Sequence, residues 1–308
     1  MNCITLQSFA KINLGLSLLK KRLDGYHEII TVFQAIDLHD TLTLKSNHTS
    51  SILLTSTGIP IPLNGDNLIH RAFLVFQNRM NLDGGLEVHV DKRIPTGGGL
   101  GGGSSNAAAT LTGLDLLYNT RLNPHDLEFM AAEIGSDVPF FIQGGTAIGE
   151  GRGERLSPID LPWDCWVLLV CPAISVSTAW AYGQARIGLT KDEKLTNFRS
   201  IFQKNASHAL RGSLHNDLEE AVFKRHPLLG LFKEDMYKWD AFYASMSGSG
   251  SSVYGLFDRL EQAEAARSFF MVDKRVMTFL CRPISSYSAS AMAADVIRHD
   301  CRHSKCVE

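Results

Sequence analysis

A run of glycines in the middle of the chain has the composition of a phosphate-binding loop. Six of the seven residues from 97 to 103 are glycine, and Ser104 and Ser105 follow them. Backbone N–H groups in such a run are not covered by side chains, and a helix that begins there adds its own free N–H groups and the positive end of its dipole. The run therefore predicts a cradle for anionic phosphates, with a flexible linker as the less favoured interpretation.

Two other phosphate-binding patterns fit this run less well. The Walker pattern requires a lysine at the position that Ser104 occupies. The dinucleotide pattern G-x-G-x-x-G matches formally at Gly97, Gly99 and Gly102, but a run this rich in glycine matches many patterns by chance. The acidic residue that should end the next strand is also missing, because the candidate, Asp115, falls inside a predicted helix. A dehydrogenase is therefore the least favoured class.

The residues on either side of the run predict the elements that would position it. Residues 86–90 alternate between apolar and polar side chains, as in a half-buried strand. From Ala107 to Tyr118 apolar residues recur at helical spacing, and Ser104 or Ser105 is the expected N-cap. The glycine run would thus lie between a strand and the first turn of a helix.

The remaining pattern predicts mixed strands and helices on both sides of a glycine-rich hairpin or linker at residues 146–153. This mixture indicates two α/β or α+β domains. We place the boundary near the linker, which gives an N-terminal domain of residues 1–155, a C-terminal domain of residues 156–282 and an appended tail of residues 283–308. The expected strands are 12–18, 29–36, 41–45, 52–55, 166–170, 242–246, 253–257 and 276–280, and the expected helices are 67–77, 215–223, 227–236 and 261–270.

The composition excludes several classes of function. The chain has 308 residues, 44% of them apolar, and a formal net charge of −2, which argues against a nucleic-acid binder that uses clustered Lys and Arg. No apolar run approaches the length of a membrane span. The six scattered cysteines favour a reducing compartment, and the first residues lack a secretory signal. We therefore expect a cytoplasmic protein that binds neither nucleic acid nor membranes.

Five segments resemble the GHMP kinases, the family of galactokinase, homoserine kinase and mevalonate kinase. They occur in the family's order and together extend from residue 8 to about residue 282. They are Ser8-Phe-Ala-Lys-Ile-Asn-Leu14, Arg22-Leu-Asp-Gly-Tyr-His27, Pro95-Thr-Gly-Gly-Gly-Leu-Gly-Gly-Gly-Ser-Ser-Asn-Ala-Ala108, Gly135-Ser-Asp-Val-Pro-Phe-Phe141 and Ser245-Met-Ser-Gly-Ser-Gly-Ser251.

This resemblance implies an α+β fold of two domains, with ATP and substrate bound in the cleft between them. The segment at residues 22–27 is similar to one branch of the family, which phosphorylates the 2-hydroxyl of 4-(cytidine 5′-diphospho)-2-C-methyl-D-erythritol in non-mevalonate (MEP pathway) isoprenoid synthesis. It implies a small-molecule kinase that uses ATP and Mg²⁺ as a monomer or weak homodimer. Because the resemblance begins at Ser8, we expect no transit peptide before it.

The resemblance also assigns roles to individual residues. Asp137 would be the base that accepts the hydroxyl proton, and Lys11 would favour the ionised carboxylate and stabilise the charge that develops on the transferring group. Asn67 would approach the nucleotide, although a helix cap is an equally good interpretation. The residues expected to hold the ATP phosphates are Pro95, Thr96, Gly97, Gly98, Gly99, Leu100, Gly101, Gly102, Gly103, Ser104 and Ser105, and one serine hydroxyl would face Mg²⁺.

Five residues are expected to contact the substrate: Asn13, Tyr26, His27, Thr178 and Tyr182. An aromatic ring can stack on cytosine and an imidazole can form hydrogen bonds with its edge. Tyr182 would supply the opposite stacking face, or it would belong to a helix core. Gly248 and Gly250 are expected to shape the floor of the site.

Two alternatives remain open. Another GHMP kinase, acting on homoserine, a sugar or mevalonate, would leave the segment at residues 22–27 unexplained. A sensor that binds ATP and a metabolite without turnover would have no need of a base such as Asp137. In the tail, the spacing of His299, Cys301, His303 and Cys306 lacks a zinc-finger frame, so we assign no metal there.

Overall fold

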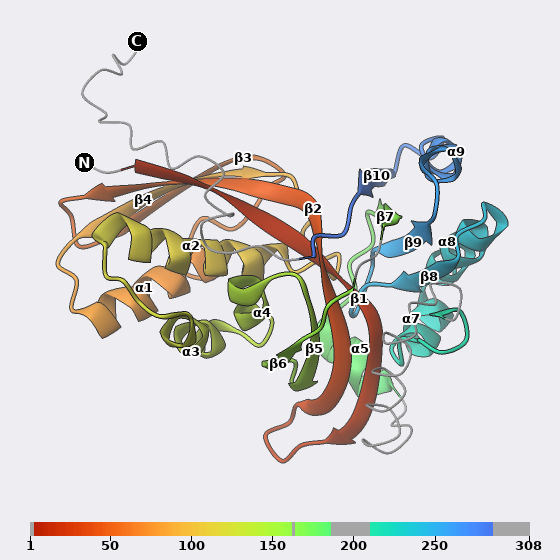
Figure 1. Ribbon diagram of the computed structural model, residues 1–308, viewed down its shortest axis with the longest axis horizontal. Coiled ribbons are helices and arrows are strands. Elements are labelled where there is room, and N and C mark those ends of the chain that lie inside the picture. The colour runs from red at the N-terminus through yellow and green to blue at the C-terminus, as the bar shows by residue number, and fades with distance from the viewer. Residues whose placement is uncertain (1–2, 162–163, 186–209, 286–308) are drawn as a thin grey trace, which may run out of the picture.

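The structure of the protein is a computed structural model, which describes residues 3–161, 164–185 and 210–285. Within these ranges a six-stranded sheet and a four-stranded sheet form two halves. A long antiparallel pair, β1 (Cys3–Lys21) and β2 (His27–Asn47), runs through the larger half, bends and projects as a hairpin beside the smaller half (Figure 1). The site lies where this pair bends.

Strand β2 organises the larger sheet because both of its edges are used. One edge pairs with β1 along its length. The other edge pairs with β5 (Thr146–Gly151) in its first half and with β4 (Gly85–Lys92) in its second half. β3 (Ile52–Gly58) lies parallel to β4, and β6 (Arg155–Pro158) pairs with β5. The two strands predicted at residues 29–36 and 41–45 are therefore one bent strand, because β1 pairs with β2 on both sides of a register shift between Phe9 and Ala10.

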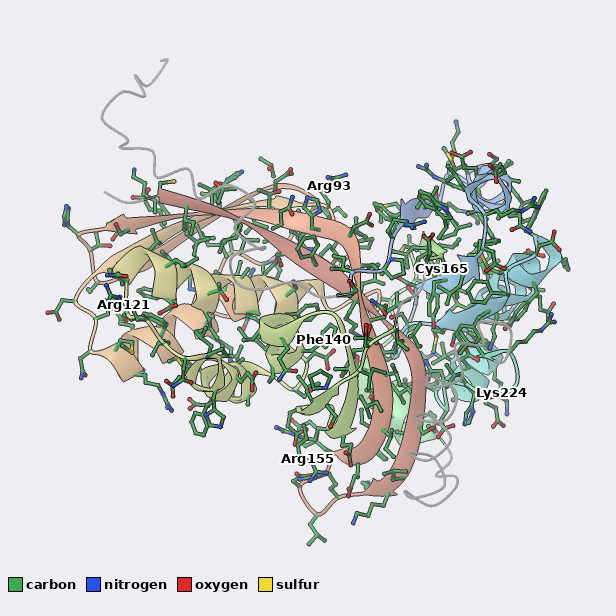
Figure 2. All side chains as sticks on the ribbon, viewed as in Figure 1. Arg93, Arg121, Phe140, Arg155, Cys165 and Lys224 are labelled. Atoms are coloured by element: carbon green, nitrogen blue, oxygen red, sulfur yellow. The ribbon has the colours of Figure 1, made fainter. Side chains whose placement is uncertain are left out.

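Helices cover one face of the larger sheet (Figure 1). They are α1 (Leu68–Met80), α2 (Gly102–Tyr118), α3 (Pro124–Ile134) and α4 (Val138–Gln143). Their apolar side chains form one cluster with the strands, and Phe140 of α4 lies fully buried within it (Figure 2). α2 carries small residues against the sheet, so its first turn and the glycine run are fixed close to β1.

The smaller half is an antiparallel sheet with strand order β10-β7-β9-β8, flanked by helices. No helix in the described ranges has the length and hydropathy to cross a bilayer. The elements of the smaller half are β7 (Trp166–Pro172), α5 (Thr178–Gln184), α7 (Glu219–Arg225), α8 (Pro227–Lys238), β8 (Tyr243–Met246), β9 (Val253–Phe257), α9 (Leu260–Phe270) and β10 (Val276–Cys281).

Helix α7 begins four residues later than the predicted start at residue 215. Asn216 explains the delay, because it forms a parallel bridge with Leu16 and its side-chain amide donates to the carbonyl oxygens of Met246 and Gly248. Its backbone is thus used to join the two halves. The amphipathic spacing in the sequence does not distinguish this use from a first helical turn.

The two halves are joined by buried polar contacts as well as apolar packing. The hydroxyls of Tyr243 and Tyr254 donate to the carbonyl oxygens of Leu14 and Asn13, at 2.6 and 2.9 Å. After β10, Pro283 bridges back to β2, so the first residues of the predicted tail lie against the larger sheet. The domain limits remain a prediction. The zinc-like spacing at residues 299–306 lies outside the described residues.

Candidate active site

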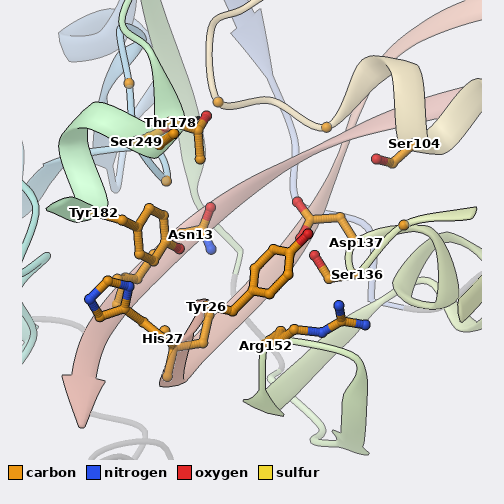
Figure 3. Close-up of a pocket in the computed structure, with 18 of the residues that line it drawn as sticks. Asn13, Tyr26, His27, Ser104, Ser136, Asp137, Arg152, Thr178, Tyr182 and Ser249 are labelled. Carbon is orange, nitrogen blue, oxygen red and sulfur yellow. Dashed lines mark hydrogen bonds between the residues drawn. The ribbon is translucent and has the colours of Figure 1, made fainter. Parts of the chain in front are cut away.

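Two adjoining cavities meet at the glycine run. The larger, of about 780 Å³, lies between the β1–β2 hairpin, the segment before α4, α5 and the loop that joins β8 to β9 (Figure 3). The smaller, of about 330 Å³, lies between the glycine run and the start of α1. Gly97, Gly99, Gly101 and Ser104 line both cavities. One elongated ligand, or two that react with each other, can therefore meet along this run.

The backbone of the run requires glycine at specific positions. Gly97, Gly99 and Gly101 have φ values of +70°, +75° and +70°, in the left-handed region that side chains rarely adopt. A Cβ atom at Gly99 would stand 2.0 Å from the carbonyl oxygen of Ser247. Gly101 is the N-cap residue of α2, so the predicted serine N-cap is wrong. The first three residues of the helix, Gly102, Gly103 and Ser104, line the smaller cavity, and N–H groups in the first turn of a helix have no partner within the helix.

Ser105 does not reach either cavity. Its side chain is fully buried, and its hydroxyl accepts a hydrogen bond from the hydroxyl of Ser8 at 2.7 Å. Its backbone N–H donates to the carbonyl oxygen of Gly101. The structure thus gives the Ser105 side chain a buried contact away from both cavities, and its role in holding phosphate stays a prediction that these contacts do not support. The other predicted phosphate residues line the smaller cavity: Pro95, Thr96, Gly97, Gly98, Gly99, Leu100, Gly101, Gly102, Gly103 and Ser104.

Asn67 combines the two interpretations that the sequence left open. It is the N-cap of α1, where its Oδ1 accepts from the N–H of Ile69 at 3.0 Å. Its Nδ2 donates to the carbonyl oxygen of Pro62, and the residue also lines the smaller cavity. Its cap contacts thus fix the wall of that cavity.

The glycine run is held from both halves of the molecule. From β1, the backbone N–H of Lys11 donates to the carbonyl oxygen of Leu100 at 3.0 Å. From the loop between β8 and β9, the hydroxyl of Ser247 donates to the carbonyl oxygen of Gly99 at 2.8 Å, and the N–H of Ser252 donates to that of Gly98 at 3.2 Å. These carbonyl oxygens are already engaged within the protein, so the groups that the run offers to a ligand are its backbone N–H groups.

Lys11 and Asp137 form the polar centre of the larger cavity. The ammonium group of Lys11 donates to Asn13 Oδ1 at 2.6 Å and to the carbonyl oxygen of Gly99 at 2.9 Å, and it lies 3.6 Å from Asp137 Oδ2. Burial lowers the pKa of Lys11, and the Asp137 carboxylate partly opposes this effect. A cation is thus fixed beside a carboxylate.

Asp137 occupies the N-cap position of α4 but makes no side-chain capping bond. About one third of its side chain is exposed, whereas Lys11 is almost fully buried. The carboxylate is therefore free to accept a hydrogen bond from a ligand in the cavity. This pairing of a buried cation with an accessible carboxylate suits proton removal from a bound hydroxyl.

The five predicted substrate residues all line the larger cavity (Figure 3). The rings of His27 and Tyr182 lie 5.6 Å apart between centroids, and Tyr26 remains 58% exposed. Burial, and then the nearby charge of Lys21, lowers the pKa of His27, so its imidazole is neutral near pH 7. Thr178 hydrogen-bonds to Ser249 on one side of the cavity, with 3.0 Å between their oxygens (Figure 3). An aromatic and neutral polar wall results.

Asn13 differs from the other four because its side chain is already engaged. Its Oδ1 accepts from Lys11 and its Nδ2 donates to Thr31 Oγ1 at 2.8 Å. Thr31 in turn donates to the carbonyl oxygen of Gly15. The chain of bonds fixes the ammonium group of Lys11, so we expect Asn13 to position Lys11 in addition to facing the cavity.

Sequence reasoning missed four polar residues of the larger cavity: Lys21, Ser136, Arg152 and Ser249. Ser136 and Ser249 lie within recognised segments, and their positions beside Asp137 and Gly248 were the available signal. Arg152 lies in the hairpin that the sequence suggested was a linker. An arginine between two glycines was the only sign of a functional role there.

Comparison with known proteins agrees with this geometry. The GHMP kinases N terminal domain model matches residues 67–145, and the GHMP kinases C terminal model matches residues 196–272. The 4-diphosphocytidyl-2-C-methyl-D-erythritol kinase of Alkaliphilus metalliredigens is 40% identical over 86% of this chain and 92% of its own length. That of Gloeobacter violaceus is 37% identical over 92% of this chain and 95% of its own.

Solved structures add the fold. A crystal structure of 4-(cytidine 5′-diphospho)-2C-methyl-D-erythritol kinase matches 90% of this chain and 99% of its own, with a TM-score of 0.74 and 32% identity. A homoserine kinase from Cytophaga hutchinsonii matches with a TM-score of 0.75 but 17% identity, over 94% and 96% of the two chains, which shows the shared two-domain fold alone. The chain belongs to the GHMP kinase family and, within it, to the 4-diphosphocytidyl-2-C-methyl-D-erythritol kinases.

Proposed function

We propose that this enzyme transfers the γ-phosphoryl group of ATP to the 2-hydroxyl of 4-(cytidine 5′-diphospho)-2-C-methyl-D-erythritol, in the synthesis of isoprenoid precursors. The observation that carries the proposal is the Lys11–Asp137 pair, which lies in the larger cavity beside the glycines shared with the smaller one. The relatives' names and the retained segment at residues 22–27 identify the acceptor.

In this proposal ATP binds with its adenosine in the smaller cavity, beside Asn67, and with its phosphates on the glycine run. The N–H groups at the start of α2 and the helix dipole favour the negative phosphates there. Mg²⁺ would neutralise phosphate charge, and Mg²⁺ in kinases usually keeps waters and takes few protein ligands. Ser104 could supply one such protein ligand, because its half-buried hydroxyl lies at the junction of the two cavities.

The acceptor hydroxyl is placed beside Asp137. As the hydroxyl oxygen forms its bond to the γ-phosphorus, the bond from phosphorus to the bridging oxygen of ADP breaks and the hydroxyl proton passes to the carboxylate. The ammonium group of Lys11 lies 3.6 Å from the Asp137 carboxylate, where it can stabilise the negative charge that develops on the transferring group. Positioning and fixed charge thus supply the catalysis.

The cytosine end of the substrate is placed against the aromatic wall. Tyr26 and Tyr182 offer stacking faces, and the neutral imidazole of His27 can both donate to and accept from the pyrimidine edge. Thr178 and Ser249, already bonded to each other, would close the wall. This end of the cavity therefore selects the substrate. We also propose that the enzyme acts in the cytoplasm.

The test is ADP release with ATP, Mg²⁺ and one alcohol at a time: the cytidine-diphosphate methylerythritol, mevalonate, homoserine or galactose. We expect release with the first alone. Release with another alcohol would keep the kinase and overturn the substrate. No release with any of them, with ATP still binding, would favour the sensor interpretation.

A further inference from the structure

The larger cavity contains more positive charge than the transfer step needs. Three cationic side chains line it: Lys11, Lys21 and Arg152. The ammonium group of Lys11 is committed to Asn13, Gly99 and Asp137. Lys21 ends β1 at the hairpin and Arg152 contacts Tyr26 of the same hairpin, and the phosphoryl-transfer mechanism uses neither of them.

Arg152 is held in place while its hydrogen-bond donors stay free. Its guanidinium carbon lies 5.0 Å from the ring centroid of Tyr26, in a cation–π contact. Among the residues that the structure describes, no carboxylate lies within ion-pair distance of the guanidinium group. The backbone N–H of Arg152 donates to Glu154, which fixes the main chain at this turn of the hairpin. A planar cation with unused donors thus faces the cavity beside an aromatic ring (Figure 3).

We propose that the Arg152 guanidinium binds the diphosphate group that links the two ends of the acceptor substrate. This inference rests on the proposed function, because it takes from it the position of the cytosine on the aromatic wall and of the hydroxyl at Asp137. The diphosphate must then lie between these points, and Arg152 contacts Tyr26 and lines the same cavity as Asp137 (Figure 3).

The chemistry of the group matches the ligand. Arginine presents several N–H donors in one plane and binds two phosphate oxygens at once, whereas a lysine acts as a point charge. The contact with Tyr26 limits the motion of the side chain before the ligand arrives, which lowers the entropic cost of binding. Lys21 faces solvent and lies opposite His27 in the strand register, so we assign it an auxiliary electrostatic role.

The experiment compares binding of cytidine and of cytidine diphosphate by calorimetry. Arg152→Gln should weaken binding of the diphosphate by about 10- to 100-fold, as expected for the loss of charge-assisted hydrogen bonds, and change binding of cytidine by less than about 2-fold. Arg152→Lys should recover part of the loss. Arg155→Gln is the matched control, because Arg155 follows three residues later but lies outside the cavity and near Glu28.

Three outcomes would contradict the inference. Equal loss of both ligands in Arg152→Gln would mean that the arginine only supports the Tyr26 ring. Unchanged binding of both would remove Arg152 from recognition while leaving the proposed substrate intact. If the wild-type enzyme bound neither cytidine nor its diphosphate, the proposed acceptor and this inference would both be wrong.

Discussion

The glycine run and the tip of the β1–β2 hairpin border the same cavity but are built in opposite ways. The run is fixed by hydrogen bonds from both halves of the molecule, and Lys11 beside it is buried. The hairpin tip is held mainly by its own turn, with Arg22 paired to Asp24, and its Leu23 side chain is fully exposed. Transfer of phosphate requires one geometry, whereas the recognition end can vary without disturbing it.

The largest effect is expected at the fixed end. Asp137→Asn keeps the size of the side chain but cannot accept the proton, so we expect kcat to fall by about 10²- to 10⁴-fold. Binding of ATP should stay within about 3-fold, because Asp137 does not line the smaller cavity. Steady-state ADP release and nucleotide titration measure the two quantities. Asp126→Asn, near the start of α3, is the control, and near-normal turnover of Asp137→Asn would remove this residue from the mechanism.

A second change separates the clash at Gly99 from its backbone conformation. Gly99→Ala places a methyl group 2.0 Å from the carbonyl oxygen of Ser247 and forces a positive φ on alanine. We expect unfolding free energy to fall by more than about 2 kcal/mol, and nucleotide affinity to fall with it. Gly97→Ala has a similar φ and open space, so it should lose only about 1 kcal/mol. Equal losses in urea titrations would show that the contact with Ser247 does not fix the run.

The smallest effects are expected at the hairpin tip. Tyr26→Ala removes a stacking face and should raise KM for the acceptor by about 10-fold with kcat changed little. Leu23→Ala, three residues earlier and outside the cavity, should leave kinetics and stability unchanged within about 0.5 kcal/mol. If Tyr26→Ala lowered kcat by as much as it raised KM, the hairpin tip would take part in positioning the reacting groups. The contrast between the two ends of the cavity would then be weaker than we state.

Much of the fold and of the candidate site could be predicted from the sequence, because local patterns determine these parts. The glycine run, the alternating strand before it and the helical spacing of apolar residues after residue 107 indicated the phosphate site without knowledge of the fold. The two-domain fold and the kinase family followed from the resemblance and are confirmed. Lys11, Asp137 and the five expected substrate residues line one cavity, and their roles there remain a prediction.

What could not be predicted depends on tertiary contacts. The N-cap at Gly101 and the burial of Ser105 follow from the packing of α2 against β1, which brings Ser8 to the Ser105 hydroxyl. The single long β2 follows from its pairing with β1. Arg152 could not be recognised because its role depends on the approach of one hairpin to another. Periodicity records only which residues are apolar.

The attachment of the glycine run to both halves has a thermodynamic consequence. A segment bonded at once to β1 and to the loop at Ser247–Ser252 cannot keep its shape if either half melts. The two sheets should therefore lose their structure in one cooperative transition, and a nucleotide bound to the run should raise the melting temperature of the entire enzyme. The glycine run therefore couples the unfolding of the two domains.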